Sequence, residues 1–382
     1  MAEIKILYDG WPAVYEPFSP AAMHLQALLA QLPDRIQPIV AVPDSPPDWL
    51  SSFSVHVHPG QNTPSGRLGW EQRILPQLDR KFNPDLLHLT STHPPLLGPG
   101  NSVVSPAGFG EFETISISSG GKSNRTFKER VREALASGGL ARARALIWPD
   151  DLPVPEISTP ILQMPPTVHP GFFNKTHGAG ERISGNGRTS QQEYHQAELP
   201  ETFILYHGPG DPVSLSKLVE AWSWAAGSIG EYYPLLVLGL DDRAWRRLEK
   251  LLGGSDLAGT IRPAPALPSD HIHDLYAGCT ALFHPAPVSP WGGPVRHALA
   301  SGKPVVSIEG KRANAMVGPA AYLVPPGDSR ALAAALITVV VEETVAENLA
   351  EQAIRRAARW QSPDFKHALV TIYEKLLGQT AG

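Results

Sequence analysis

The chain has 382 residues, of which 42% are hydrophobic and 18% charged, as expected of a soluble globular protein long enough for two domains. The net charge of −5 is no polyanion-binding signature, so nucleic acid is not an expected partner. The single cysteine, Cys279, excludes disulfides within the chain and thiolate zinc sites. No apolar run reaches the ~20 residues that span a bilayer, and no signal-peptide pattern opens the chain, so we expect a cytoplasmic protein.

The first half of the chain alternates between short apolar runs and segments with helical periodicity. Strands are expected at residues 3–8, 36–42, 54–58, 85–89, 102–104, 145–148 and 159–164. Helices are expected at residues 20–32, 70–82 and 122–143. From residue 169 to about residue 200 this pattern fails, and Gly, Ser, Asn, Gln and Thr indicate a linker or mobile interdomain loop.

A second alternating series follows this linker. Strands are expected at residues 202–206, 234–238, 260–262, 281–284 and 303–308. Helices are expected at residues 214–226, 243–252, 271–278, 294–301, 329–341, 345–360 and 365–377. Such alternation is typical of parallel sheets with helices on both faces. We therefore predict an α/β fold with two doubly wound, Rossmann-like domains, whose ligands lie in a cleft beyond the carboxyl ends of the strands.

The most informative stretch is residues 288–306, V-S-P-W-G-G-P-V-R-H-A-L-A-S-G-K-P-V-V. Pro294 suits the first position of a helix, and Gly302 suits its end. Unpaired backbone N–H groups at such a helix start can bind phosphate. The alternative is an ordinary loop–helix–strand unit in which the glycines make a tight turn, and the residues alone do not decide between the two.

This stretch resembles the loop and helix of family 4 (group 1) glycosyltransferases, whose usual form is E-G-F-G-L-P-x-x-E-A-x-A-x-G-x-P-V-V. The matching residues are Trp291, Gly292, Pro294, Ala298, Ala300, Gly302, Pro304, Val305 and Val306. Residues 317–328 resemble the family's downstream segment, and residues 205–222 resemble its first C-domain strand and helix. Residues 6–10 and 70–76 resemble a bacterial subset of the family.

The resemblance implies the GT-B architecture. Its expected parts are an acceptor-side domain at residues 1–168, a linker at 169–200, a nucleotide-sugar domain at 201–360, and a last helix at 361–382 that crosses back. It implies a nucleoside-diphosphate sugar as donor substrate, no cofactor, no metal, and transfer with retention of configuration. The donor-binding residues that it nominates are Gly208, Ser289, Trp291, Gly292, Gly293, Pro294, His297 and Leu267. Of these, Ser289 faces the sugar and His297 the ribose, the two glycines offer N–H groups, and residues 263–267 face the base.

Several charged residues of the family are missing. Its two glutamates fall on Ser289 and His297, which can hydrogen-bond hydroxyls but are not fixed carboxylates. Its Arg-Lys pair, which binds the donor diphosphate, falls on Pro209 and Val213. Lys217, one turn further along, is read as a surface lysine, and the alternative is that it reaches back to the diphosphate. The family's N-domain histidine aligns near residues 105–108 and is absent, and the sequence nominates no catalytic base.

Other residue clusters favour structural roles. His56 and His58 share a face of one strand but lack a third metal ligand, and the acidic pairs at 150–151 and 241–242 suit turns or caps. The basic helix at residues 122–144 is read as a solvated face, and the alternative is a peripheral contact with an anionic membrane or phosphorylated acceptor.

Three functional hypotheses remain at this point. The first is a glycosyltransferase acting on an unknown acceptor. The second is a catalytically inactive homologue that serves as a binding or partner subunit of another glycosyltransferase, which the missing charges favour. The third is a sugar-nucleotide epimerase of the same architecture, for which no acidic and basic side chains are evident.

Overall fold

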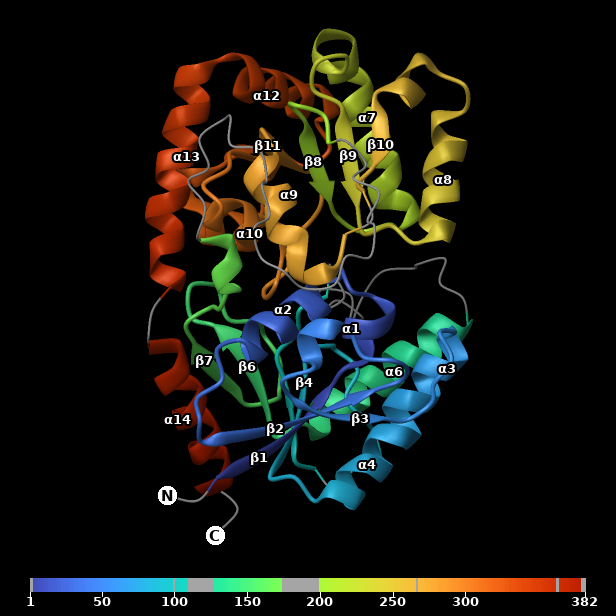
Figure 1. The fold of residues 1–382 in the computed structure, drawn as a ribbon, viewed down its shortest axis with the longest axis vertical. Helices are drawn as coiled ribbons and strands as arrows, with labels where there is room; N and C mark the ends of the chain where they lie inside the picture. The colour runs from blue at the N-terminus through green and yellow to red at the C-terminus, as the bar shows by residue number, and fades with distance from the viewer. Residues whose placement is uncertain are drawn as a thin grey trace, which may run out of the picture.

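Two parallel β-sheets organise the chain, one in each half of the molecule (Figure 1). The computed structural model describes residues 3–98, 100–108, 127–173, 199–265, 267–361 and 364–378, with only the backbone of residues 127–133. The first sheet has seven strands in the order β3-β2-β1-β4-β5-β6-β7, and the second has six in the order β10-β9-β8-β11-β12-β13. Both sheets reverse their winding direction at a central strand, so the predicted doubly wound α/β fold is confirmed.

The N-terminal half, coloured blue to green in Figure 1, is built on buried Val-, Ile- and Leu-rich strands. Its strands are β1 (Ile4–Asp9), β2 (Ile36–Val42), β3 (Ser54–Val57), β4 (Leu86–Leu89), β5 (Ser102–Val104), β6 (Ala145–Pro149) and β7 (Ile161–Met164). Its helices are α1 (Trp11–Tyr15), α2 (Pro20–Leu29), α3 (Pro64–Gly69), a π-helical turn (Trp70–Ile74), α4 (Leu75–Phe82) and α6 (Phe127–Arg142).

The C-terminal half repeats the same construction. Its strands are β8 (Ile204–His207), β9 (Leu235–Leu238), β10 (Ile261–Pro263), β11 (Ala281–His284), β12 (Val305–Ile308) and β13 (Tyr322–Val324). Its helices are α7 (Pro212–Ile229), α8 (Asp242–Leu252), α9 (Ile272–Gly278), α10 (Pro294–Ala300), α11 (Lys311–Val317), α12 (Ser329–Val341) and α13 (Glu343–Ala357).

Local sequence signals fix where several helices begin. Ser19 caps α2 through a hydrogen bond from the N–H of Ala22, and Pro20 takes the first helical position. The Asp211 carboxylate accepts from the N–H groups of Val213 and Ser214 and thereby starts α7. Each cap satisfies backbone donors that have no partner inside the helix.

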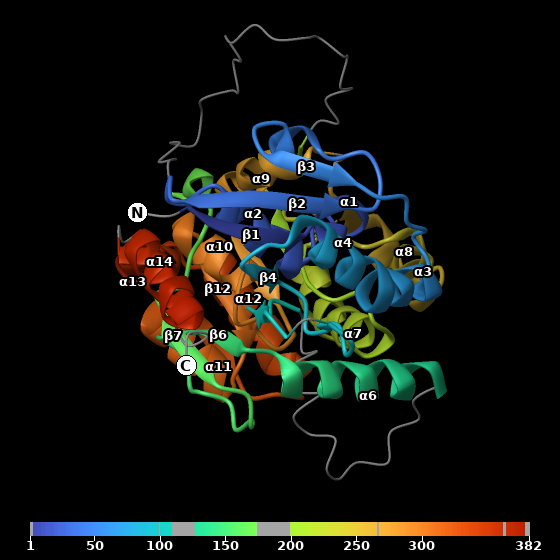
Figure 2. The same ribbon diagram turned by 90° about the horizontal axis from the view of Figure 1, so that it is seen from below.

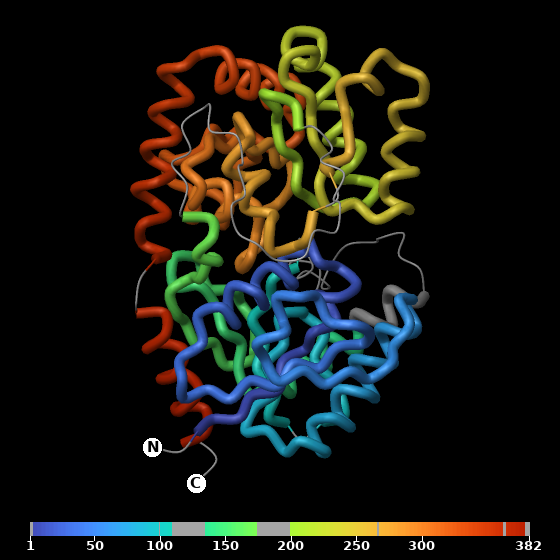
Figure 3. Tube along the Cα trace, viewed as in Figure 1, coloured from blue at the N-terminus to red at the C-terminus, as the bar shows by residue number. Residues whose placement is uncertain are grey.

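The end of the chain crosses from one half to the other. Helix α13 runs along the C-terminal half, and α14 (Asp364–Gly378) lies against β7 of the N-terminal half (Figures 1, 2 and 3). Phe365, Leu369 and Tyr373 of α14 are buried with the residues of β1 and β4 in one apolar cluster. A second cluster is continuous across both halves and includes Leu7, Leu89, Leu205 and Leu282. The two halves therefore share part of one core.

The structure adds elements that the sequence patterns did not indicate. Helices α1 and α11 and strand β13 were not expected, because each is short and lacks a full period of apolar residues. The single helix expected at residues 70–82 is a π-turn followed by α4. In the described part of the chain, no helix is long and apolar enough to cross a membrane.

Candidate functional site

The two sheets face each other through their carboxyl ends, where doubly wound domains bind ligands. His207 ends β8, and its Nε2–H donates to the Phe18 carbonyl of the N-terminal half at 2.6 Å. That bond leaves Nδ1 as an acceptor, which takes the Tyr276 hydroxyl at 2.7 Å. Burial lowers the pKa of His207 to about 4, so the imidazole is neutral at pH 7. A neutral histidine thus connects the halves beside Gly208, which is buried.

The predicted donor loop lies at the contact between the two halves. Ser289, Trp291, Gly292, Gly293 and Pro294 are all buried. The Ser289 hydroxyl lies 2.7 Å from the carbonyl of Ala107 and 2.6 Å from that of Trp291, and its single proton can serve one of them at a time. The Ser289 hydroxyl is therefore within reach of one backbone carbonyl of the N-terminal half and one of its own loop.

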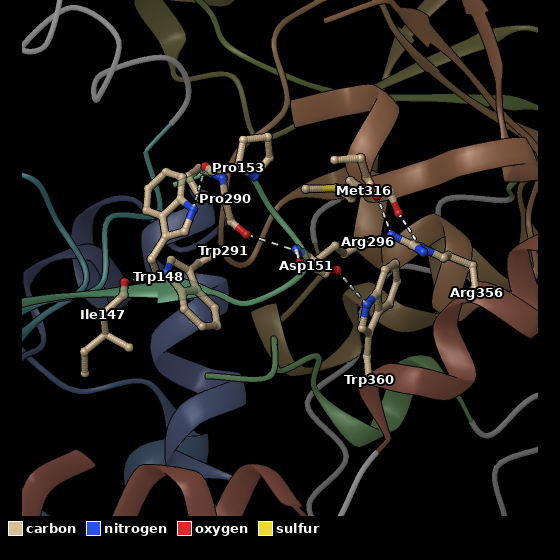
Figure 4. A network of polar contacts seen from close by, with 11 residues as sticks. Ile147, Trp148, Asp151, Pro153, Pro290, Trp291, Arg296, Met316, Arg356 and Trp360 are labelled. Atoms are coloured by element: carbon tan, nitrogen blue, oxygen red, sulfur yellow. Dashed lines mark hydrogen bonds and ion pairs between the residues drawn. The ribbon is translucent and has the colours of Figure 1, made fainter. Parts of the chain in front are cut away.

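The Trp291 side chain also contacts the N-terminal half. Its indole N–H donates to the Ile147 carbonyl of β6 at 3.2 Å (Figure 4). Its ring stacks on His24 of α2 with centroids 4.6 Å apart. The ring of Trp291, one of the predicted donor-binding residues, is thus covered on this face by the protein's own imidazole.

Gly292 is a point of close backbone contact between the two halves. Its φ is +57°, a conformation that favours glycine. A Cβ atom at this position would lie 2.3 Å from the Pro20 carbonyl oxygen and 2.6 Å from the His24 nitrogen, both backbone atoms of α2. The start of α2 therefore occupies the space directly in front of the loop.

Two residues after this loop, Arg296 makes an ion pair between the halves. Its guanidinium is fully buried and donates to both carboxylate oxygens of Asp151, at 2.9 and 2.7 Å (Figure 4). The Trp360 indole donates to the same carboxylate at 3.2 Å, and Arg296 lies over the Trp360 ring at 4.8 Å. Burial raises the pKa of Asp151, but the charge and hydrogen bonds of Arg296 outweigh it and hold that pKa below its usual value. We call these three residues the interdomain latch.

His297 has the least satisfied side chain in the site. It is fully buried, and neither ring nitrogen has a hydrogen-bond partner. Phe172 lies parallel to the imidazole, with centroids 4.2 Å apart and planes within 3°, and Tyr276 meets it edge-on at 5.7 Å. Burial lowers the pKa of His297 well below its ordinary value, and the charges of the neighbouring His207 and His169 act in the same direction. Each unpaired buried polar atom costs about 1–3 kcal/mol, so this arrangement needs an explanation.

A buried chain of polar side chains lies behind the loop in the N-terminal half. The Ser105 hydroxyl bridges the Nε2 atoms of His24 and His88, at 2.9 and 2.8 Å. The Nδ1 atom of His88 contacts the Tyr373 hydroxyl at 2.5 Å, and that hydroxyl lies 3.1 Å from the hydroxyl of Tyr8. Where the resemblance predicted an absent histidine near residues 105–108, the fold thus brings two imidazoles from other elements.

The positions expected to bind a diphosphate carry no cation. Pro209 is half-buried, and Val213 is exposed, with 61% of its surface accessible. Lys217, the cation one turn further along α7, is also exposed. Arg247 of α8 donates to the Gly210 carbonyl of this turn at 3.0 Å. Leu267 lies in the segment before α9 and packs, partly buried, against the shared apolar cluster.

Two further sequence interpretations concern metals and the basic helix. Within the described ranges, no group of three or more His, Cys, Asp or Glu side chains is placed to hold a metal ion. Asp151, one member of an acidic pair noted in the sequence, is a partner of Arg296 instead. Residues 122–126 of the basic helix lie outside the described residues, and α6 is described from Phe127.

Sequence reasoning missed Arg296, Phe172 and His24 as members of this site. A cation flanked by Pro294, Val295 and Ala298 in a short apolar helix was the available signal for a buried ion pair. No sequence signal points to Phe172 or His24, because their side-chain partners lie 81 or more residues away along the chain.

Comparison with known proteins supports the resemblance. Residues 214–342 match the model of "Glycosyl transferases group 1". Sucrose-phosphate synthase from Thermosynechococcus elongatus is 16% identical, with a TM-score of 0.67 over 99% of this chain and 100% of that one. WaaG, a glycosyltransferase involved in lipopolysaccharide biosynthesis, is 16% identical with a TM-score of 0.67, over 97% and 99% of the two chains. This chain has the GT-B fold.

The same GT-B fold is seen in Anabaena HepE in complex with UDP and glucose, which is 16% identical with a TM-score of 0.65 over 100% of both chains. Comparison by sequence with curated proteins finds no match. The matched range 214–342 contains the loop at residues 289–294, His297 and Leu267. The GT-B fold of this chain therefore carries the group 1 sequence pattern on the half that the resemblance assigned to the nucleotide sugar.

Proposed function

We propose that this protein is a glycosyltransferase that binds a nucleoside-diphosphate sugar between its two domains and transfers the sugar to an acceptor, with retention of configuration. The observation that carries the proposal is the group 1 match over residues 214–342, whose loop lies where the carboxyl ends of both sheets meet. HepE, with the same fold, is known in complex with UDP-glucose, which supports a donor of this class.

The resemblance to group 1 glycosyltransferases suggests the roles of individual residues. The N–H groups of Gly292 and Gly293 contact the phosphates or the sugar, Ser289 the sugar, and His297 the ribose. Pro209 and Val213 supply no charge for the diphosphate, so we expect turnover to be slow. Loss of one donor for a developing charge commonly costs 10²–10³ in rate.

Donor binding is tested by thermal stabilisation with UDP, GDP, ADP and their glucose conjugates. A ligand at 100 times its dissociation constant adds about 2.7 kcal/mol to the free energy of unfolding, which is readily seen as a higher melting temperature. We expect one nucleotide series to stabilise the protein, and His297→Ala to lose that effect. Replacement of the exposed His367 by Ala is the matched control. Failure of every nucleotide to stabilise the native protein would refute the donor site.

A second candidate is an inactive homologue that acts as a partner subunit. It is favoured by Pro209 and Val213 at the diphosphate positions and by the bonds of Ser289 and Trp291 to the N-terminal half. Release of free sugar from the stabilising donor, followed over hours, discriminates between the two candidates. Binding without any hydrolysis or transfer supports the partner subunit.

A further inference from the structure

An open cavity of about 480 Å³ lies at the amino-terminal edge of the first sheet. It is lined by the end of α4, by the segments that precede β4, β5 and β6, and by Leu377 near the end of α14. Helix α4 and the end of the chain lie at the bottom of Figure 1, whereas the two halves meet near its middle. Small-molecule sites have volumes of roughly 300–1,000 Å³. The cavity is therefore large enough for a small molecule, and it lies at the opposite edge of the sheet from the proposed donor site.

Two guanidinium groups of this cavity are not engaged by the protein. Arg144 is half-buried and Arg80 is exposed, and within the described ranges neither side chain forms an ion pair or a hydrogen bond. Arg142 adds a third cation from an adjoining hollow, which shares Gly100 and Asn101 with the cavity. Arg80 and Arg142 lie in the last turns of α4 and α6, where a cation interacts favourably with the helix end. Arg144 lies beyond α6, so the helix end does not explain its place in the cavity.

The acidic side chains of the cavity, in contrast, are held by the protein itself. Asp79 is buried, and its Oδ1 atom accepts a hydrogen bond from Nδ2 of Asn101 at 2.9 Å. The same amide group donates to the Pro84 carbonyl at 3.4 Å, which fixes the wall between β4 and β5. The exposed Asp85 carboxylate accepts from the N–H of Lys5 at 2.8 Å, and it keeps lone pairs that can accept from a hydroxyl group. The groups left for a ligand are thus two guanidinium donors and a carboxylate acceptor.

We propose that this cavity binds a small anion that carries hydroxyl groups, such as a sugar phosphate or a sugar acid. Guanidinium groups bind phosphate and carboxylate through paired N–H donors, so Arg80 and Arg144 receive the anionic group. The Asp85 carboxylate and the Asn83 amide, both in the lining, bind the hydroxyl groups. The inference goes beyond the proposed function and does not depend on it, because the donor site lies at the other edge of the sheet.

Calorimetric titration of the native chain tests the class of ligand. The probes are glucose 6-phosphate, ribose 5-phosphate and gluconate, with glucose and inorganic phosphate as the two separate parts of such a ligand. We expect at least one of the three hydroxylated anions to bind about tenfold or more tightly than glucose and than inorganic phosphate, because each part alone forms only some of the hydrogen bonds. Tighter binding of the two phosphates identifies phosphate as the anionic group, and tighter binding of gluconate identifies carboxylate. Equal affinity for glucose or for inorganic phosphate would contradict the inference.

Substitutions of the two arginines test the place of binding. Arg80→Gln and Arg144→Gln keep a polar side chain but remove the charge, and each should raise the dissociation constant about tenfold or more. Both variants should keep the native melting temperature, because neither guanidinium bonds to the described part of the protein. Arg243→Gln, at an exposed arginine of α8 in the other half, is the control and should keep the native affinity. Absence of binding by all three hydroxylated anions would overturn the inference, and so would binding that is equally tight in Arg80→Gln and Arg144→Gln.

Discussion

At the scale of single residues, Gly292 is the position where the two halves leave no room for a side chain. Its backbone is left-handed, and its missing Cβ lies against backbone atoms of α2 that no rotamer change can move. A glycine in the loop is usually explained by access for a ligand's phosphates. In this chain the atoms that approach it are the Pro20 carbonyl and the His24 nitrogen.

Gly292→Ala is therefore expected to lower the free energy of unfolding by more than the roughly 1–2 kcal/mol of a left-handed alanine alone. Urea denaturation measures this loss. Gly310→Ala is the control, because Gly310 has an extended φ of 172° and no atom within 4 Å of its added Cβ. Equal stability of the two variants would show that α2 does not press against the loop in solution.

His207 gives the site a predictable dependence on pH. Its folded pKa of about 4 lies below the unfolded value of 6.5, so below pH 6.5 the unfolded chain takes up a proton that the folded chain does not. Stability is thus unaffected above pH 6.5 and falls as the pH drops toward 4, by about 1.4 kcal/mol per pH unit for this one group. The buried imidazoles of His88, with a pKa of about 3, and His284, at about 4, act in the same direction.

In His207→Gln, the decline in unfolding free energy between pH 6.5 and pH 5 should be shallower by about 1.4 kcal/mol per pH unit. Urea titrations at several pH values measure the slope. His367→Gln, which changes an exposed histidine, should keep the native slope. An unchanged slope in His207→Gln would mean that His207 is already protonated or solvated in the folded protein.

At the scale of elements, helix α10 carries a buried charge, on Arg296, whose carboxylate partner lies in the other half of the molecule. Arg296 is completely buried, and the carboxylate that pairs with it comes from Asp151 after β6. A buried ion pair is costly to break from one side, because the remaining charge keeps its desolvation penalty.

Asp151→Ala should therefore destabilise the protein by about 3–5 kcal/mol, as measured by urea denaturation. Glu351→Ala breaks an exposed pair with Arg355 and should cost less than about 1 kcal/mol. The joint replacement Asp151→Leu with Arg296→Met removes both charges and should recover most of the loss. A loss in Asp151→Ala no larger than that in Glu351→Ala would contradict the latch.

Helix α14 offers a similar test at the other end of the molecule. Its Tyr373 hydroxyl contacts both His88 and Tyr8, so Tyr373→Phe leaves buried polar atoms unpaired and should cost about 1–3 kcal/mol. Thermal or urea unfolding measures the change. Tyr322→Phe, at a tyrosine that is 41% exposed, is the control and should be near neutral. Unchanged stability of Tyr373→Phe would indicate that water satisfies the hydrogen bonds of His88 and Tyr8.

These elements also show which parts of the structure can be predicted from the sequence. The periods of apolar residues indicated most strands and the helices at residues 214–226, 243–252 and 329–341, because burial imposes those periods locally. Short segments such as β13 carry too few residues for a period. The contacts of Arg296 with Asp151, Phe172 with His297 and His24 with Ser105 join distant positions, so they depend on the packing of the two halves.

At the scale of the whole molecule, the two halves are closed on each other. One apolar cluster runs through both, and the latch, Ser289, Trp291 and His207 each bond across the boundary. The proposed ligand lies at that boundary, so a donor must replace some of these bonds. Binding then depends on how often the halves separate.

A substitution that weakens the interdomain latch but keeps the size of its side chains should therefore favour binding of the nucleotide. Asp151→Asn keeps the size of the side chain but removes the charge that pairs with Arg296, and it should raise the fraction of open molecules. We expect the radius of gyration from small-angle scattering to increase from the compact value of about 21 Å for a chain of this length, and the dissociation constant for the stabilising nucleotide to fall about 10–100-fold. Glu351→Gln, which changes only the exposed pair, should leave both quantities unchanged. A larger radius with unchanged affinity would show that separation of the two halves does not limit access of the ligand to its site.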